Sequence, residues 1–155
     1  GDDDTIQEPT SILIPSLHFS FLHGHAETIR AFCEIVQLAG FPETDIVKLL
    51  SANNADGTPG FHMAFKHPEA ENLIKTFVPA IKILDISDAN KIKLLAAKNA
   101  YGIPAAHWAW KNEKRNAISA YSDVVLNSGL PAENIRELLA ANAPLLGRIA
   151  KAIVP

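Results

Sequence analysis

The chain repeats itself at a nearly fixed interval, and this limits the folds open to it more than any other feature. Pro15, Pro59 and Pro104 are 44 and 45 residues apart. Two further columns keep the interval, namely Phe32, Phe77 and Tyr121, and Leu50, Leu95 and Leu139. Repeats of about 20–50 residues with helical content indicate a stacked solenoid, because each unit buries its apolar face against its neighbours. We therefore expect an all-α solenoid of three repeats, each with about three helices.

The repeat divides the chain into predicted segments. Residues 1–10 form a flexible acidic leader or expression scar, and residues 11–155 form a single domain. Its units cover about 11–52, 53–97 and 98–141. Residues 142–155 form a C-terminal capping helix, with Leu145, Leu146, Ile149 and Ile153 placed to close the stack.

Each unit is predicted to hold a short first helix, a longer second helix and a leucine-rich third helix. In the first unit these helices cover 15–22, 26–39 and 43–52. In the second unit, the first helix covers about 59–66 and the second helix opens at Pro68, with Pro79 expected to kink or shorten it. Asp85 and Ser87 are candidate caps for the third helix. The last unit contains helices over 104–111, about 115–126, and 132–141.

The repeat columns also predict packing. Ser20, Ala64 and Ala109 are small, as expected where two helices approach closely. Bulky side chains follow them, and we expect these to form an aromatic ladder between repeats: Phe21, Phe65 and Trp110. Pairs of leucines in the third helices predict a second ladder.

The segment Asp56-Gly57-Thr58-Pro59 predicts a tight turn that leads into a helix. Asp-Gly favours a turn, because glycine readily adopts a positive φ. Thr58 is placed to cap the helix, and Pro59 to occupy its first position, where a missing N–H costs little.

Composition excludes several classes of protein. The net charge of −3 comes without a basic block, so nucleic acid is not the expected partner. No stretch reaches the ~18 apolar residues of a membrane span, so no membrane insertion is expected. The single cysteine, Cys33, excludes an internal disulfide and a cysteine-based zinc cluster, and it is compatible with a reducing compartment.

The repeated segments resemble ankyrin repeats. The ankyrin pattern of a turn, Thr-Pro-Leu-His, a small residue and Gly-His is matched in part by three segments: 18–25, Asp56–Pro59 with His62-x-Ala64, and Gly102 and Pro104 with His107-x-Ala109. One extra residue follows each proline column, and the period exceeds the 33 residues of ankyrin, which leaves room for a third helix. The units therefore look like elongated ankyrin repeats, similar to those of bacterial effectors injected into host cells. This resemblance implies virulence, secretion into a host cell, and a host protein as partner.

The histidines do not form a convincing metal site. His18, His62 and His107 share one repeat column, and a site that acts once does not need three copies. The resemblance implies that this column ties each helix start to its turn. His23 and His25 are two residues apart, so on a helix they would point to different sides. We expect no metal and no cofactor.

Catalysis is the weaker interpretation. Cys33 lies between apolar residues of the second helix, which favours a small buried side chain over a nucleophile. No phosphate loop, serine elbow or glycosidase-type pair of carboxylates occurs. We predict no catalytic residues. The alternatives are an enzyme domain that uses a groove histidine or Cys33, and a structural spacer or oligomerisation segment.

The ankyrin resemblance implies that the first helices and the turn tips line a concave groove. Aromatic residues and methionine are enriched at interface hot spots, which favours protein binding there. The predicted function is a protein–protein interaction module, the partner- or substrate-recognition region of a larger protein. An alternative is that Phe19 and Trp108 pack beneath the third helices. The predicted contact residues are Phe19, Leu22, His23, Met63, Lys66, Tyr101, Ile103, Trp108, Lys111 and Asn112.

Overall fold

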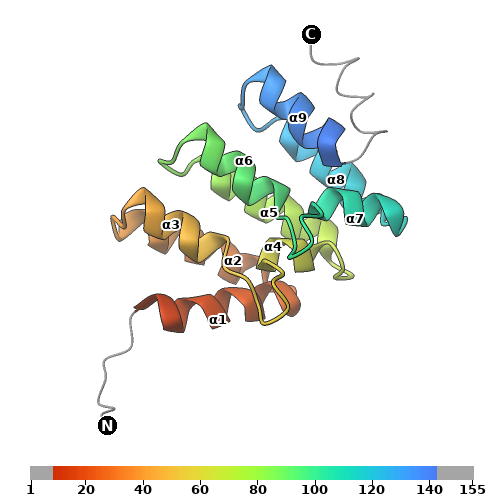
Figure 1. Cartoon of the computed structure of the whole chain (residues 1–155). Coiled ribbons are helices and arrows are strands. Elements are labelled where there is room, and N and C mark those ends of the chain that lie inside the picture. Colours follow the sequence, from red (N-terminus) through yellow and green to blue (C-terminus); the bar gives the residue numbers. More distant parts are fainter. Residues whose placement is uncertain (1–8, 143–155) are drawn as a thin grey trace.

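The computed structural model describes residues 9–142, and its side chains from residue 16 to residue 139. This part of the chain is all-helical (Figure 1). Its helices are α1 (Pro9–Leu22), α2 (Ala26–Leu38), α3 (Glu43–Leu50), α4 (Gly60–Ala64), α5 (Ala70–Lys82), α6 (Asp88–Ala96), α7 (Ala105–Lys111), α8 (Arg115–Leu126) and α9 (Ala132–Asn142). The all-α prediction is confirmed. Helix α1 begins at Pro9. The predicted capping helix lies outside the described residues.

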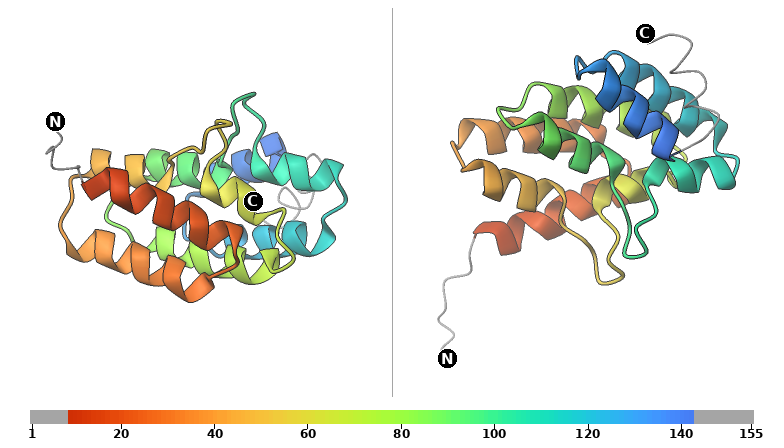
Figure 2. Two further views of the ribbon diagram at one scale, coloured as in Figure 1. Left: turned by 90° about the horizontal axis from the view of Figure 1, so that it is seen from below. Right: turned by 45° about the horizontal axis from the view of Figure 1, so that its top comes forward.

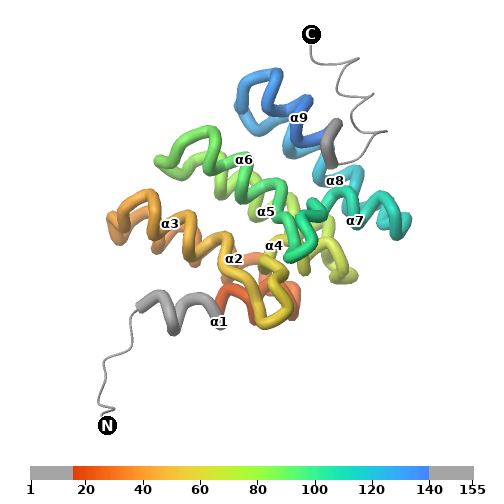
Figure 3. The backbone as a smooth tube through the Cα atoms, in the orientation of Figure 1, coloured from red at the N-terminus to blue at the C-terminus, as the bar shows by residue number. Residues whose placement is uncertain are grey.

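The helices form three rows. Helices three places apart in the sequence pack side by side, which gives the rows α1–α4–α7, α2–α5–α8 and α3–α6–α9. Figure 2 shows these rows from two further directions, and Figure 3 shows how the backbone passes through each row once before it returns to the first. Residues at equivalent positions of the 44–45-residue period therefore lie in the same row.

Apolar periodicity places the core between the rows. On α2, Ile29, Phe32, Cys33 and Val36 are all buried, as their spacing predicts. The small side chains of the first row are buried, and so are the leucine pairs of the third row: Ser20, Ala64 and Ala109; Leu49 and Leu50, Leu94 and Leu95, Leu138 and Leu139. Truncating one of these leucines to alanine costs about 2–5 kcal/mol.

Two predicted helix starts were wrong. Helix α4 begins at Gly60, with Pro59 at the N-cap and no side-chain cap, so Thr58 does not cap it. A Cβ atom on Gly60 would lie 2.6 Å from Cδ2 of Phe21, which explains why glycine starts this helix. Helix α5 begins at Ala70, two residues after Pro68.

Helix α5 also continues past Pro79 to Lys82, so the proline does not shorten it. Pro79 is exposed, while Val78, Ala80 and Ile81 beside it are buried. Burial against the neighbouring helices therefore outweighs the one backbone hydrogen bond that proline removes. The prediction for Ser87 is confirmed, because its hydroxyl caps α6 by accepting from the Asn90 N–H at 3.2 Å.

The predicted aromatic ladder is only partly correct. The Phe21 ring lies 5.2 Å from that of Phe77, and the Phe65 ring lies 5.4 Å from that of Tyr121, measured between ring centroids. Phe61, which the repeat columns did not single out, joins these pairs at 4.6 Å from Phe77 and 5.2 Å from Phe65. Trp110 is 38 % exposed and is not a buried member of the ladder. It belongs to the last unit, where no further repeat follows within residues 9–142.

Candidate functional site

The predicted contact residues lie along the α1–α4–α7 row and on the turns beside it. At the α1 end, Phe19 and Leu22 are each 55 % exposed, although both are large and apolar. The Phe19 ring lies 4.2 Å from the ring of His23 and 5.7 Å from that of His25. These side chains form an exposed aromatic cluster at the turn between α1 and α2.

The middle of the row is partly covered by its own side chains. The Lys66 ammonium lies 4.9 Å from the ring centroid of Trp108, a cation–π distance. Trp108 is half-buried and packs against the core. Met63 is half-buried too, and its sulfur accepts a hydrogen bond from the Asn54 amide at 3.4 Å. This part of the row therefore offers a lysine and portions of two large side chains.

The α7 end is polar. Lys111 and Asn112 are exposed, and the Asn112 side-chain amide donates to the carbonyl oxygen of Trp108 at 2.8 Å. No aspartate or glutamate occurs in the described residues of α1, α4 or α7. The formally charged side chains of these helices, with Lys66 just after α4 included, are therefore lysines.

Two loops beside the row have the same internal structure. The Asn54 Oδ1 atom accepts from the backbone N–H groups of Asp56 at 2.9 Å and Thr58 at 3.0 Å. Forty-five residues later, the Asn99 Oδ1 atom accepts from the backbone N–H groups of Tyr101 at 2.9 Å and Ile103 at 3.0 Å. The two asparagines therefore shape the loops, a role that the sequence interpretation did not assign.

The two loop tips lie against each other. A Cβ atom on Gly57 would approach the Cβ atom of Ala100 to 2.7 Å. Gly57 and Gly102 both have a φ of 76°, which favours glycine. Tyr101 is 88 % exposed and Ile103 is 37 % exposed. The loops thus present two apolar side chains on a backbone held by asparagine.

The histidine column is structural where its contacts are described. His62 is buried, and its Nδ1 atom lies 2.8 Å from the carbonyl oxygen of Ala97. Burial lowers the pKa of His62, the charge of Lys66 acts in the same direction, and the Ala97 carbonyl opposes them. Burial also lowers the pKa of His18, against the effect of the Ala52 backbone. Both ring nitrogens of His18 are buried without a well-formed hydrogen bond. These two imidazoles are therefore held in the neutral form.

His67 is also packed against a neighbouring turn. Its Nδ1 atom accepts from the Glu69 N–H at 2.9 Å. A Cβ atom on Gly24 would lie 2.5 Å from the His67 ring, so glycine at position 24 allows the ring to sit over this turn.

Cys33 is placed for packing. It is 2 % exposed, and burial raises the pKa of its thiol to about 12. A thiol of this kind stays protonated near neutral pH, so it is a poor nucleophile. Within residues 9–142, no three His, Cys, Asp or Glu side chains are grouped to hold a metal ion.

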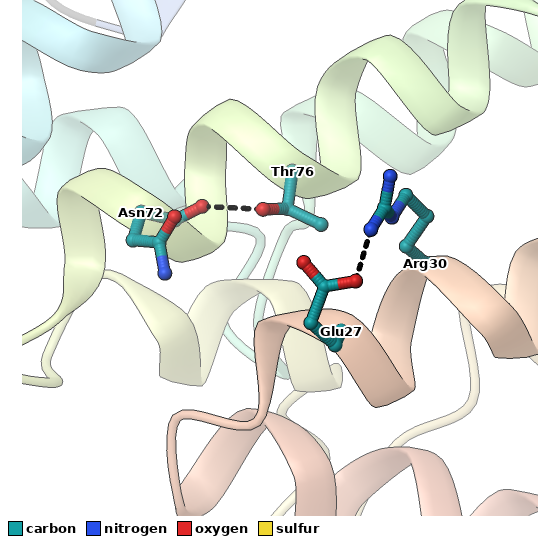
Figure 4. A network of polar contacts seen from close by, with 4 residues as sticks. All are labelled: Glu27, Arg30, Asn72 and Thr76. Atoms are coloured by element: carbon teal, nitrogen blue, oxygen red, sulfur yellow. Dashed lines mark hydrogen bonds and ion pairs between the residues drawn. The ribbon is translucent and has the colours of Figure 1, made fainter.

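The sequence interpretation missed a second surface, a groove of about 820 Å³ between α2 and α5. Leu38 and Ile83 lie beside this groove at equivalent positions 45 residues apart, 85 % and 71 % exposed. The recurrence of an apolar residue at positions 38 and 83 was the sequence signal that could have indicated this groove. Figure 4 shows its polar side, where Glu27 pairs with Arg30 and the Thr76 hydroxyl donates to the Asn72 carbonyl at 2.8 Å.

Comparison with protein-family models, with curated proteins and with solved structures found no match for this chain. Among the described helices, none combines the length and apolar character needed to cross a membrane.

Proposed function

We propose that the chain is a solenoid of elongated ankyrin-like repeats whose α1–α4–α7 row binds another protein. Two observations support the repeat assignment. Equivalent helices pack side by side along three rows, and the Asn54 and Asn99 side chains accept equivalent backbone hydrogen bonds. The ankyrin resemblance of the sequence adds to them.

The observation that carries the binding proposal is the composition of the exposed part of this row. Phe19 and Leu22 expose apolar area on a helix surface, Tyr101 and Ile103 do so on the neighbouring loop, and Lys66 lies over Trp108. Large exposed apolar side chains bordered by polar ones are typical of interaction sites. The buried Cys33 thiol and the buried imidazole of His62 speak against the enzyme alternative.

In this proposal the chain is the recognition region of a larger protein. The resemblance to the ankyrin-like arrays of bacterial effectors makes a host-cell protein the partner to test first. Because the described parts of α1, α4 and α7 contain no carboxylate and Lys66 and Lys111 are exposed, acidic groups on that partner would be favoured.

A photo-crosslinking experiment tests the proposal. A benzophenone amino acid replaces Met63 on the row, and in a control chain it replaces Ile83 beside the α2–α5 groove. Each chain is exposed to host-cell lysate, and the crosslinked protein is identified, purified and titrated against the unmodified chain. We expect crosslinking through position 63 and weaker binding of the purified partner by the Phe19→Ala and Lys66→Glu variants.

The control at position 83 distinguishes binding at the α1–α4–α7 row from binding at the α2–α5 groove. Ile83→Ala should leave the affinity unchanged, because the side chain lies outside the row. A partner that crosslinks through position 83 instead, or that binds Phe19→Ala and Lys66→Glu as tightly as the unmodified chain, contradicts the proposal.

A further inference from the structure

One aromatic column of the repeat is buried in the first two units and partly exposed in the last. Phe21, Phe65 and Trp110 occupy one repeat column, and their side chains are 0 %, 1 % and 38 % exposed. Phe77 on α5 covers Phe21, and Tyr121 on α8 covers Phe65. In both cases the covering ring comes from the second helix of the following unit. Within residues 9–142 no following unit exists to cover Trp110 in the same way.

Trp110 lines a groove of about 720 Å³ along α8. Ile118, Ser122 and Leu126 also line it, and their spacing of four residues places them on one face of the helix. The residues equivalent to Leu126 in the earlier units are Gln37 and Lys82. The last unit therefore has an aliphatic side chain at the groove where the earlier units have polar ones.

We propose that residues 143–155 of this chain cover the Trp110 groove. They directly follow α9, which packs against both α7 and α8, the two helices that supply the groove residues named above. The segment thus starts from a helix that contacts α7 and α8, and the covalent link gives it a high effective concentration near the groove. This proposal is independent of the function proposed for the α1–α4–α7 row.

The composition and length of the segment fit this position. Leu145, Leu146, Ile149 and Ile153 recur at the spacing of one helical stripe. As a helix, a segment of this length would span about 20 Å, comparable with the length of α8. The stripe would meet Trp110, Ile118 and Leu126 in a groove that the charged side chains of Glu71, Lys75, Arg115 and Asp123 also line. Burial of its apolar part would stabilise the contact.

The test uses Trp110 as its own probe. Trp108→Phe leaves Trp110 as the one tryptophan in the chain. Fluorescence emission and acrylamide quenching are then measured for the full chain and for a chain that ends at Asn142. We expect the shortened chain to emit at longer wavelength, to be quenched more steeply, and to unfold at lower temperature.

Two point variants of the full chain test the proposal even if the shortened chain does not fold. Ile153→Asp removes an aliphatic side chain from the stripe. Val154→Asp makes the same change of charge one residue away, outside the stripe. We expect Ile153→Asp to expose Trp110 as the truncation does, and Val154→Asp to leave the quenching unchanged.

Two results would overturn the proposal. One is equal quenching of Trp110 in the full chain and in the Ile153→Asp variant. The other is quenching that depends on protein concentration, with a dimer detected by light scattering, because the groove would then be covered by a second copy.

Discussion

The Nδ1 atom of His62 lies 2.8 Å from the carbonyl oxygen of Ala97, a residue 35 positions further along the chain. Ala97 is the C-cap of α6 and has a left-handed backbone with a φ of 46°. The imidazole therefore links the start of the second unit to its end. Sequence reasoning assigned this histidine to its own turn, so its structural role was predicted but its partner was not.

Removing this contact should weaken the fold. His62 is 1 % exposed, so His62→Ala leaves the Ala97 carbonyl without its partner at a buried site. We expect a loss of about 1–3 kcal/mol in the free energy of unfolding, measured by urea denaturation. His25→Ala is the control, because His25 is exposed and its replacement should change stability by less than about 0.5 kcal/mol. Equal effects of the two substitutions would contradict the structural role.

The same histidine should make stability depend on pH. Burial and the charge of Lys66 lower the pKa of His62 below its ordinary value of 6.5, which the unfolded chain retains. Below pH 6.5 the unfolded chain thus binds a proton that the folded chain does not, so the free energy of unfolding falls as the pH falls. His18, whose pKa burial also lowers, acts in the same direction.

Urea denaturation at pH 7.5 and at pH 5.5 measures this effect. The unmodified chain should lose more stability between the two pH values than His62→Gln, which has no titrating group at this position. A His62→Gln chain with the full pH dependence would show that other groups cause it.

Two phenylalanines of one row should differ sharply in their contributions. Phe61 is 1 % exposed and its ring lies among those of Phe21, Phe65 and Phe77, whereas Phe19 is 55 % exposed. We expect Phe61→Ala to cost about 3–5 kcal/mol in thermal or urea unfolding. Phe19→Ala should change stability by less than about 0.5 kcal/mol. A large loss of stability from Phe19→Ala would show that this ring belongs to the core and not to the exposed surface.

The sequence alone predicted the features that depend on periodicity. A side chain's place in a helical repeat determines which face it lies on, so the buried leucine pairs and the small residues of the first row followed from their columns. Phe61 could not be found in this way, because its importance comes from contacts with Phe21 and Phe77, each on another helix. Trp110 was misplaced for the opposite reason, since its column is buried only where another unit follows.

The candidate site was predicted less completely than the core. Phe19 and Tyr101 are exposed, but Trp108 is half-buried against the core, with Lys66 of the preceding unit over its ring. Such a contact leaves no periodic signal. Thr58 was a reasonable cap by residue type, yet helix α4 begins at Gly60 with Pro59 as its N-cap and no side-chain cap.

The asparagine side chains at positions 54 and 99 should be required to hold their loops in the observed conformation. The Asn99 Oδ1 atom accepts two backbone hydrogen bonds, from Tyr101 and Ile103, and the Asn99 N–H donates to the Ile103 carbonyl at 3.0 Å. Asn99→Ala removes both side-chain bonds, each of which contributes about 0.5–1.5 kcal/mol. Asn99→Asp keeps a carboxylate oxygen in the accepting position and should retain most of the stability.

Hydrogen exchange at the amides of Tyr101 and Ile103 measures the effect directly: exchange should accelerate in Asn99→Ala and remain slow in Asn99→Asp. If both variants exchange at the same rate as the unmodified chain, the loop is held by its backbone alone, and the shared asparagine has no part in presenting Tyr101.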